Sequence, residues 1–218
     1  MTRAHIQTSF ARKPLDYVLS GPGAVRVLRA LLAHGGYLSV SRLADDTLMT
    51  PMGVRKVLDD LTRNRLVHVT GSGRSRLYQA IAAHPLSVGL TQLFKTESDR
   101  FSGVVDAVKV IAQKPEISAA WLFGSVARYT DTPESDFDVA VVMKDFWFDM
   151  DADQIRTEMA RAAEALGFQV SVTAMSQSDI VHHHDTESAF WTSIKADAIA
   201  IQGLPPEALV RVLKAGAA

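Results

Sequence analysis

The chain has 218 residues, of which 47% are apolar and 22% are charged, and its formal net charge is −1. This size and apolar fraction suit one large or two small globular domains and exclude a wholly disordered chain. No run approaches the ~18–20 apolar residues that span a bilayer, and residues 1–13 lack the apolar core of a signal peptide. The absence of cysteine excludes disulfides, thiol catalysis and Cys-ligated zinc. We therefore expect a cytoplasmic protein without membrane contact.

The near-zero net charge conceals two halves of opposite charge. Residues 1–83 contain 12 Lys and Arg against 5 Asp and Glu, a net charge of +7. Residues 84–218 contain 11 against 19, a net charge of −8. Such a split favours two units with different partners, and the basic half suits a polyanion such as nucleic acid. Chance placement of solvated charges is the alternative.

The basic half carries the pattern of three helices and a hairpin. Apolar residues at helical spacing end at Gly35-Gly36, and Ser39 or Ser41 can cap a short second helix. Thr50-Pro51 predicts the start of a third helix, with a capping threonine followed by proline at the first helical position. Two short strands at 66–70 and 76–80, around a basic Gly-rich tip, predict the hairpin.

This order of elements resembles the winged helix-turn-helix of bacterial transcription regulators. In that family the third helix enters the major groove of double-stranded DNA, while the wing contacts the backbone or the minor groove. Asp59 and Asp60 are expected to lie away from the DNA. A winged helix used for protein contact or dimerisation is the alternative. The resemblance implies DNA contacts from the third helix, the second helix and the wing, at Thr50, Met52, Arg55, Lys56, Ser41, Arg42, Arg74 and Arg76.

Residues 84–112 predict a helical connector between a domain at 1–83 and a domain at 113–218. Apolar residues at helical spacing fall in two runs, and the polar stretch 95–100 between them can bend or divide the helix. A helix that is apolar over a broad face needs cover, which favours a homodimer. Packing against the protein's own domains is the competing account.

The strongest motif lies in the acidic half. The apolar run Ala119–Phe123 is followed directly by Gly124-Ser125 and, after ten residues, by Asp136-Phe137-Asp138 at the start of a second apolar run. Alternate residues of a strand share a face, so the two aspartates can share a divalent cation, and Mg²⁺ prefers such oxygen ligands. Gly124 lets the backbone approach a phosphate, and Ser125 and Arg128 add donors at a predicted helix start.

This constellation resembles the minimal nucleotidyltransferases of the DNA polymerase β-like superfamily. The resemblance implies an α+β fold in which a mixed sheet is flanked by helices. It also implies that Asp136 and Asp138 bind Mg²⁺ or Mn²⁺, and that Gly124, Ser125 and Arg128 contact a nucleoside triphosphate. In the family a hydroxyl attacks the α-phosphorus and pyrophosphate leaves.

One departure bears on activity. Active members generally carry a third carboxylate on the next sheet strand, where it completes the metal site and helps to deprotonate the attacking hydroxyl. Here the helix predicted at 151–166 is followed by a strand at 168–173, and alternation puts the position on Ser171, or on Gln169 or Thr173 in another register. Asp179 and Asp185 further along the chain are possible substitutes.

The preferred interpretation is a DNA-binding transcription regulator whose nucleotidyltransferase-like domain senses a nucleotide or another phosphorylated ligand. The alternative is an active Mg²⁺-dependent nucleotidyltransferase that moves a nucleoside monophosphate to a hydroxyl of a protein, small molecule or nucleic acid. A protein-interaction module of a toxin and antitoxin pair is a third option. The sequence leaves open whether the protein is an enzyme.

Overall fold

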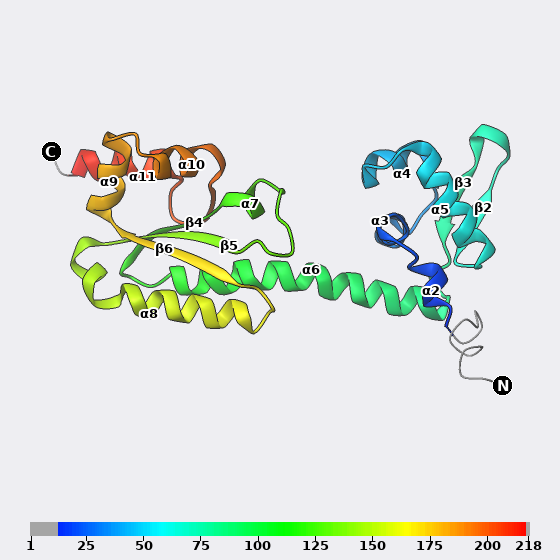
Figure 1. The fold of residues 1–218 in the computed structure, drawn as a ribbon, viewed down its shortest axis with the longest axis horizontal. Helices are drawn as coiled ribbons and strands as arrows, with labels where there is room; N and C mark the ends of the chain where they lie inside the picture. The colour runs from blue at the N-terminus through cyan, green and yellow to red at the C-terminus, as the bar shows by residue number, and fades with distance from the viewer. Residues whose placement is uncertain (1–12, 217–218) are drawn as a thin grey trace. The chain divides into compact units, whose positions relative to one another are not determined.

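The computed structural model describes residues 13–216, which divide into two compact units between Ser98 and Asp99 (Figure 1). The structure is mixed α+β, and each unit contains one sheet. Within the described range, no helix is long and apolar enough to cross a membrane.

The N-terminal unit packs helices against a small antiparallel sheet whose strand order is β1-β3-β2. Its buried core is formed by apolar residues from every helix, with Leu28, Leu43 and Leu58 fully buried. The elements are α2 (Leu15–Val18), α3 (Pro22–His34), β1 (Leu38–Ser39), α4 (Val40–Thr47), α5 (Pro51–Arg63), β2 (Val67–Thr70), the 3-10 turn η1 (Gly73–Ser75) and β3 (Leu77–Ala80).

Local capping explains where these helices begin and end. The Ser39 hydroxyl accepts a hydrogen bond from the Arg42 amide at 3.2 Å and starts α4. The Thr50 hydroxyl accepts from the Gly53 amide at 3.1 Å and starts α5, with proline in the first turn as predicted. Gly35 ends α3 in the left-handed conformation, with φ of 71°.

The predicted connector is one continuous helix, α6 (Pro85–Ala112), rather than two. The polar stretch 95–100 contains neither glycine nor proline, so nothing in it breaks the backbone hydrogen bonds. Leu90 belongs to the core of the N-terminal unit, whereas Val104 and Val108 belong to the core of the C-terminal unit.

The C-terminal unit is built on a four-stranded sheet of order β6-β5-β4-β7. The pair β5–β6 is parallel and is connected through α8, and the other pairs are antiparallel. The elements after α6 are β4 (Ile117–Phe123), α7 (Gly124–Ala127), β5 (Phe137–Met143), α8 (Asp145–Glu164), β6 (Val170–Ser176), α9 (Gln177–Asp185), α10 (Ala189–Asp197), β7 (Ile199–Gln202) and α11 (Pro206–Gly216).

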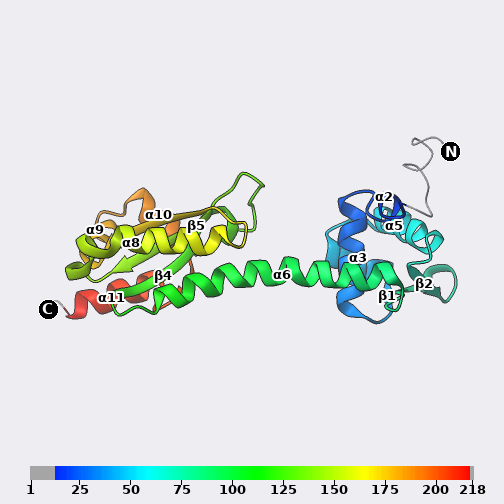
Figure 2. The same ribbon diagram turned by 90° about the horizontal axis from the view of Figure 1, so that it is seen from below.

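Helices cover both faces of this sheet. The second half of α6 and α8 lie on one face, and α9, α10 and α11 lie on the other (Figures 1 and 2). Alternation along β5 sends Phe137 and Val139 to the first layer, and Ala140 and Val142 to the second. Asp138 therefore points to the face that α10 covers.

Three predicted boundaries are wrong by a few residues. The strand β5 begins at Phe137, so Asp136 lies just before it. The strand β6 runs from Val170 to Ser176, later than predicted, because a turn at 165–167 and two irregular residues separate it from α8. The helix α8 begins at Asp145, where an acid in the first turn favours the helix dipole.

Candidate functional site

The Gly-Ser motif and the second aspartate of the Asp-x-Asp motif meet at one edge of the C-terminal sheet. Phe123, the last residue of β4, is paired with Asp138 of β5, so the chain leaves the sheet beside that carboxylate. Gly124 has φ of +76°, and a Cβ added there would lie 2.3 Å from Asp138 Oδ2. Only glycine fits this conformation and this contact, so the backbone and the carboxylate are packed against each other.

The helix that follows the Gly-Ser motif is a single turn. The helix α7 has only four residues, and Ser125 is half-buried within it. The Ser125 carbonyl accepts a hydrogen bond from the Thr130 amide at 3.0 Å, which folds the following loop back over the motif. A single turn carries little dipole, so the backbone amides and the Ser125 hydroxyl are the donors that remain for a phosphate.

The two predicted metal ligands differ in environment. Asp136 is exposed, whereas Asp138 is half-buried at the start of β5. Burial, and next the negative charge of Asp136, raise the pKa of Asp138 above its ordinary value of 3.8. A hydrogen bond from Ser171 and the positive charge of Arg128 act in the opposite direction. The site therefore carries an excess of negative charge that a cation would relieve.

Ser171 occupies the position next to Asp138 on the neighbouring strand. The two residues are partners in the parallel pairing of β5 and β6, and the Ser171 hydroxyl lowers the pKa of the Asp138 carboxyl. Gln169 precedes β6, and Thr173 is paired further along, opposite Ala140. The strand therefore presents a hydroxyl beside Asp138, at the position where a carboxylate could serve as a third metal ligand.

A buried acid that sequence reasoning missed lies on α10. Asp197 is the last residue of that helix, its side chain is 8% exposed, and its Oδ2 forms an ion pair with Arg128 Nη1. Its charge also contributes to the raised pKa of Asp138. One signal could have indicated it, because a carboxylate at a helix C-terminus opposes the helix dipole and needs a compensating cation.

The acids proposed as substitutes are engaged elsewhere. Asp179 completes a capping box with Ser176 at the start of α9. Asp185 pairs with Lys214 and His184 at the end of the same helix. Neither residue acts on the pKa of Asp138. The expectation that one of them could serve as the third carboxylate is not supported by their position.

The donor set at this edge suits a hard divalent cation. Carboxylate and hydroxyl oxygens are ligands that Mg²⁺ accepts, and Mg²⁺ in phosphate-binding sites commonly uses only one or two carboxylates. Burial first, and the negative charge of Asp136 second, raise the pKa of Asp138, so a bound cation would favour its ionised form. Across residues 13–216 no cluster of three or more His, Asp or Glu is arranged to hold a metal. The residues fit an ion shared with a ligand rather than one enclosed by protein.

The residues predicted to contact DNA lie on the surface of the N-terminal unit. Met52 is 79% exposed, and Thr50, Arg55 and Lys56 are exposed on the first turns of α5. The side chain of Arg74 lies outside the described residues. A groove of about 340 Å³ brings together residues from α4, α5 and the hairpin, namely Ser39, Val40, Ser41, Arg55, Asp59, Gly73, Arg76 and Tyr78.

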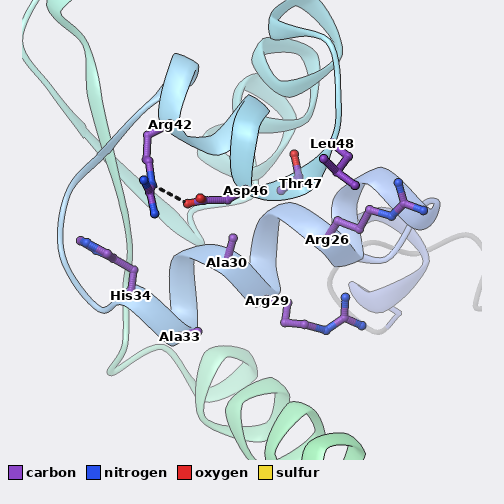
Figure 3. Close-up of a pocket in the computed structure, with 9 residues that line it drawn as sticks. All are labelled: Arg26, Arg29, Ala30, Ala33, His34, Arg42, Asp46, Thr47 and Leu48. Carbon is purple, nitrogen blue, oxygen red and sulfur yellow. Dashed lines mark hydrogen bonds and ion pairs between the residues drawn. The ribbon is translucent and has the colours of Figure 1, made fainter. Parts of the chain in front are cut away.

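Two residues have surroundings that bear on the DNA prediction. Asp59 lines the same groove as Arg55, because residues four apart share a helix face, and its expected place away from the DNA stays a prediction. Arg42 lines a separate hollow between α3 and α4, where it pairs with Asp46 at 3.0 Å (Figure 3). That hollow, of about 700 Å³, also holds Arg26 and Arg29.

Part of the chain is similar to known proteins. No curated protein matches it at a significant level. A crystal structure of the AntR antimony-specific transcriptional repressor is 25% identical over 46% of this chain and 86% of its own, with a TM-score of 0.37. A structure of a toxin–antitoxin with AMP-PNP is 18% identical over 55% of this chain and 85% of its own, with a TM-score of 0.34. Residues 106–196, which lie in α6 and the C-terminal unit, match the model of the family described as "Polymerase beta, Nucleotidyltransferase".

Proposed function

We propose that the protein is a DNA-binding transcription regulator whose C-terminal unit binds a nucleoside triphosphate together with Mg²⁺ or Mn²⁺. In this proposal residues 1–83 form a winged helix-turn-helix, 84–112 connect the domains and 113–218 bind the nucleotide. The observation that carries it is the pairing of Asp138 with Ser171, while Gly124 packs against the same carboxylate. The site keeps the groups that bind a phosphate and a metal, and it has a hydroxyl where catalysis needs a base.

The chain's own residues account for nucleotide binding in three ways. Backbone amides at Gly124 and Ser125 donate to phosphate oxygens, and the Arg128 guanidinium adds a charge-assisted contact. Asp136 and Asp138 would hold the metal, which when bound supplies charge neutralisation for the phosphates. Ser171 cannot take a proton near neutral pH, so nucleotide binding without turnover is the expected outcome.

The nucleotide proposal is tested by binding and transfer assays on the full chain. ATP, CTP, GTP and UTP are titrated with Mg²⁺ or Mn²⁺, and each labelled nucleotide is then incubated with protein and cell lysate. Metal-dependent binding without transferred label is expected. Label that is transferred by the wild type and lost in Asp136→Asn would instead establish the alternative, an active nucleotidyltransferase.

The DNA proposal rests on the groove that Arg55 and Arg76 share. Lys and Arg that contact phosphates release counterions, so the affinity should fall steeply with salt. We expect the protein to shift a fragment taken from upstream of its own coding sequence. Arg55→Ala should weaken binding by about tenfold and lower the salt slope by about one unit. Arg63→Ala is the matched control, since Arg63 lies on the same helix but pairs with Asp60.

A homodimer is the proposed form of the regulator. On the first half of α6, Val88 is 59% exposed and Leu93 is 58% exposed, so this part of the helix offers apolar side chains to a second copy. Light scattering should give the mass of a dimer for the wild type. Val88→Glu with Leu93→Glu should give a monomer, and an unchanged mass would place the interface elsewhere.

A further inference from the structure

Asp197 is a buried acid at the candidate site for which nucleotide binding alone gives no role. Its Oδ2 pairs with Arg128, while its Oδ1 is buried and has no hydrogen-bond partner among the described residues. A carboxylate whose side chain is 8% exposed is costly to keep charged unless a cation compensates it. The Arg128 guanidinium therefore supplies the positive charge that compensates this carboxylate.

The position of this pair connects it to the metal-binding edge. The helix α10 packs against α7, and the charges of both Arg128 and Asp197 act on Asp138. Arg128 follows directly on α7, and its side chain is 49% exposed. A guanidinium has five N–H donors in a planar fork, so donors remain after one edge has met a carboxylate.

We propose that Asp197 is a positioning residue that holds the Arg128 guanidinium beside Asp138, ready for the phosphates of a nucleoside triphosphate. The inference rests on the proposed function and deepens it. An unanchored arginine on a one-turn helix would lose rotamer freedom when it met a phosphate, and a buried anchor removes much of that cost before the ligand arrives.

The test is a double-mutant cycle on the full chain, with MgATP affinity as the measured quantity. Arg128→Gln and Asp197→Asn should each weaken binding by about tenfold, the loss expected for one charge-assisted hydrogen bond. The double variant should bind no more weakly than Arg128→Gln alone, because Asp197 acts only through the arginine. Independent losses that multiply in the double variant, or wild-type affinity in Asp197→Asn, would overturn the proposal.

Mn²⁺ binding without nucleotide separates positioning from ligation. If Asp197 acts through Arg128, Asp197→Asn should change Mn²⁺ affinity by no more than about threefold, the scale of a screened charge effect. A loss well beyond that would assign Asp197 to the metal and replace the proposal. Glu134→Gln, which removes an exposed charge from the loop before Asp136, is the matched control for that charge effect.

A second variant and the wild type serve as controls for misfolding. Asp197→Glu keeps the buried charge but displaces the guanidinium by one methylene, so it should fold and still lose part of the MgATP affinity, and only when Arg128 is present. Wild-type affinity in Asp197→Glu would contradict a positioning role. If the wild type binds Mn²⁺ but none of the four triphosphates, the proposed function itself fails, which is a different result from a failed cycle.

Discussion

Arg55 and Arg76 of the N-terminal unit are exposed side chains around an open groove, whereas Asp138 and Asp197 of the C-terminal unit are half-buried or buried and act on each other. Exposed charges cost little to the fold and respond to salt. Buried charges of like sign oppose folding unless they are paired, and screening affects them less. The candidate DNA-binding residues can therefore be changed with little loss of stability, whereas the candidate nucleotide site depends on its own packing.

The largest expected effects test whether the two cores are independent. Trp121 is fully buried and its indole donates to the Leu204 carbonyl at 2.8 Å, so Trp121→Ala should destabilise the C-terminal unit by about 3–5 kcal/mol. Leu58→Ala should cost the N-terminal unit about 2–5 kcal/mol. All three tryptophans lie in the C-terminal unit, so the fluorescence transition should move only for Trp121→Ala, while circular dichroism detects both. A shifted fluorescence transition in Leu58→Ala would show that the cores unfold together.

Alanine substitutions at two glycines test how tightly the backbone of each unit is packed. Gly124→Ala adds a clash with Asp138 to the strain of a positive φ, so it should lower the free energy of unfolding by about 2–3 kcal/mol. The same variant should lose MgATP binding. At Gly35, φ is also positive but nothing lies within 4 Å of an added Cβ, so Gly35→Ala should cost only about 1 kcal/mol. Chemical unfolding measures both costs. Equal values would mean that Asp138 moves aside freely, and that the packing at the site is loose.

Helix caps should give smaller and more similar effects. Thr50→Ala removes an exposed cap, and Ser176→Ala removes half of a capping box with Asp179. Each should cost about 1 kcal/mol, with Ser176→Ala the larger because its hydroxyl is buried. The free energy of unfolding in denaturant gives the values, and Thr50→Ser is the conservative control. If Thr50→Ala cost more stability than Ser176→Ala, burial of the capping hydroxyl would not be the cause of the difference.

The smallest expected effect depends on pH. The folded state raises the pKa of Asp138, so ionisation of this group opposes folding, and the cost appears as the pH rises through the folded pKa. Asp138→Asn should therefore be slightly more stable than the wild type at pH 7 and unfold at a higher temperature. The gain in free energy of unfolding should be at most about 1 kcal/mol, because water screens the site. The difference in stability between the two proteins should vanish below pH 3.8, the ordinary pKa of an aspartate. Lower stability of Asp138→Asn at pH 7 would contradict the excess of negative charge.

The sequence was most informative where structure depends on neighbouring residues. Thr50-Pro51 and Ser39 fix helix starts through bonds that span three residues. Alternation left Ser171, Gln169 and Thr173 as candidates for the position beside Asp138, and the pairing of β5 with β6 puts Ser171 there. Asp197 could not be found this way, because its partner Arg128 is 69 positions earlier and only the packing of α10 on α7 joins them. The ends of β5 and β6 were also misplaced, since the pairing of the two strands, rather than propensity, sets those ends.

The sheet order has a consequence for the time at which each unit can form during synthesis. The edge strand β7 pairs with β4 across about eighty residues, and Ala120 meets Gln202. The N-terminal unit depends on pairings that are complete by Ala80 and on the first turns of α6. A ribosome that adds residues in order, at about 5–20 per second, therefore releases a foldable basic unit several seconds before the C-terminal sheet can close. A nascent chain stalled near residue 190 would hold the basic unit without the Arg128–Asp197 pair.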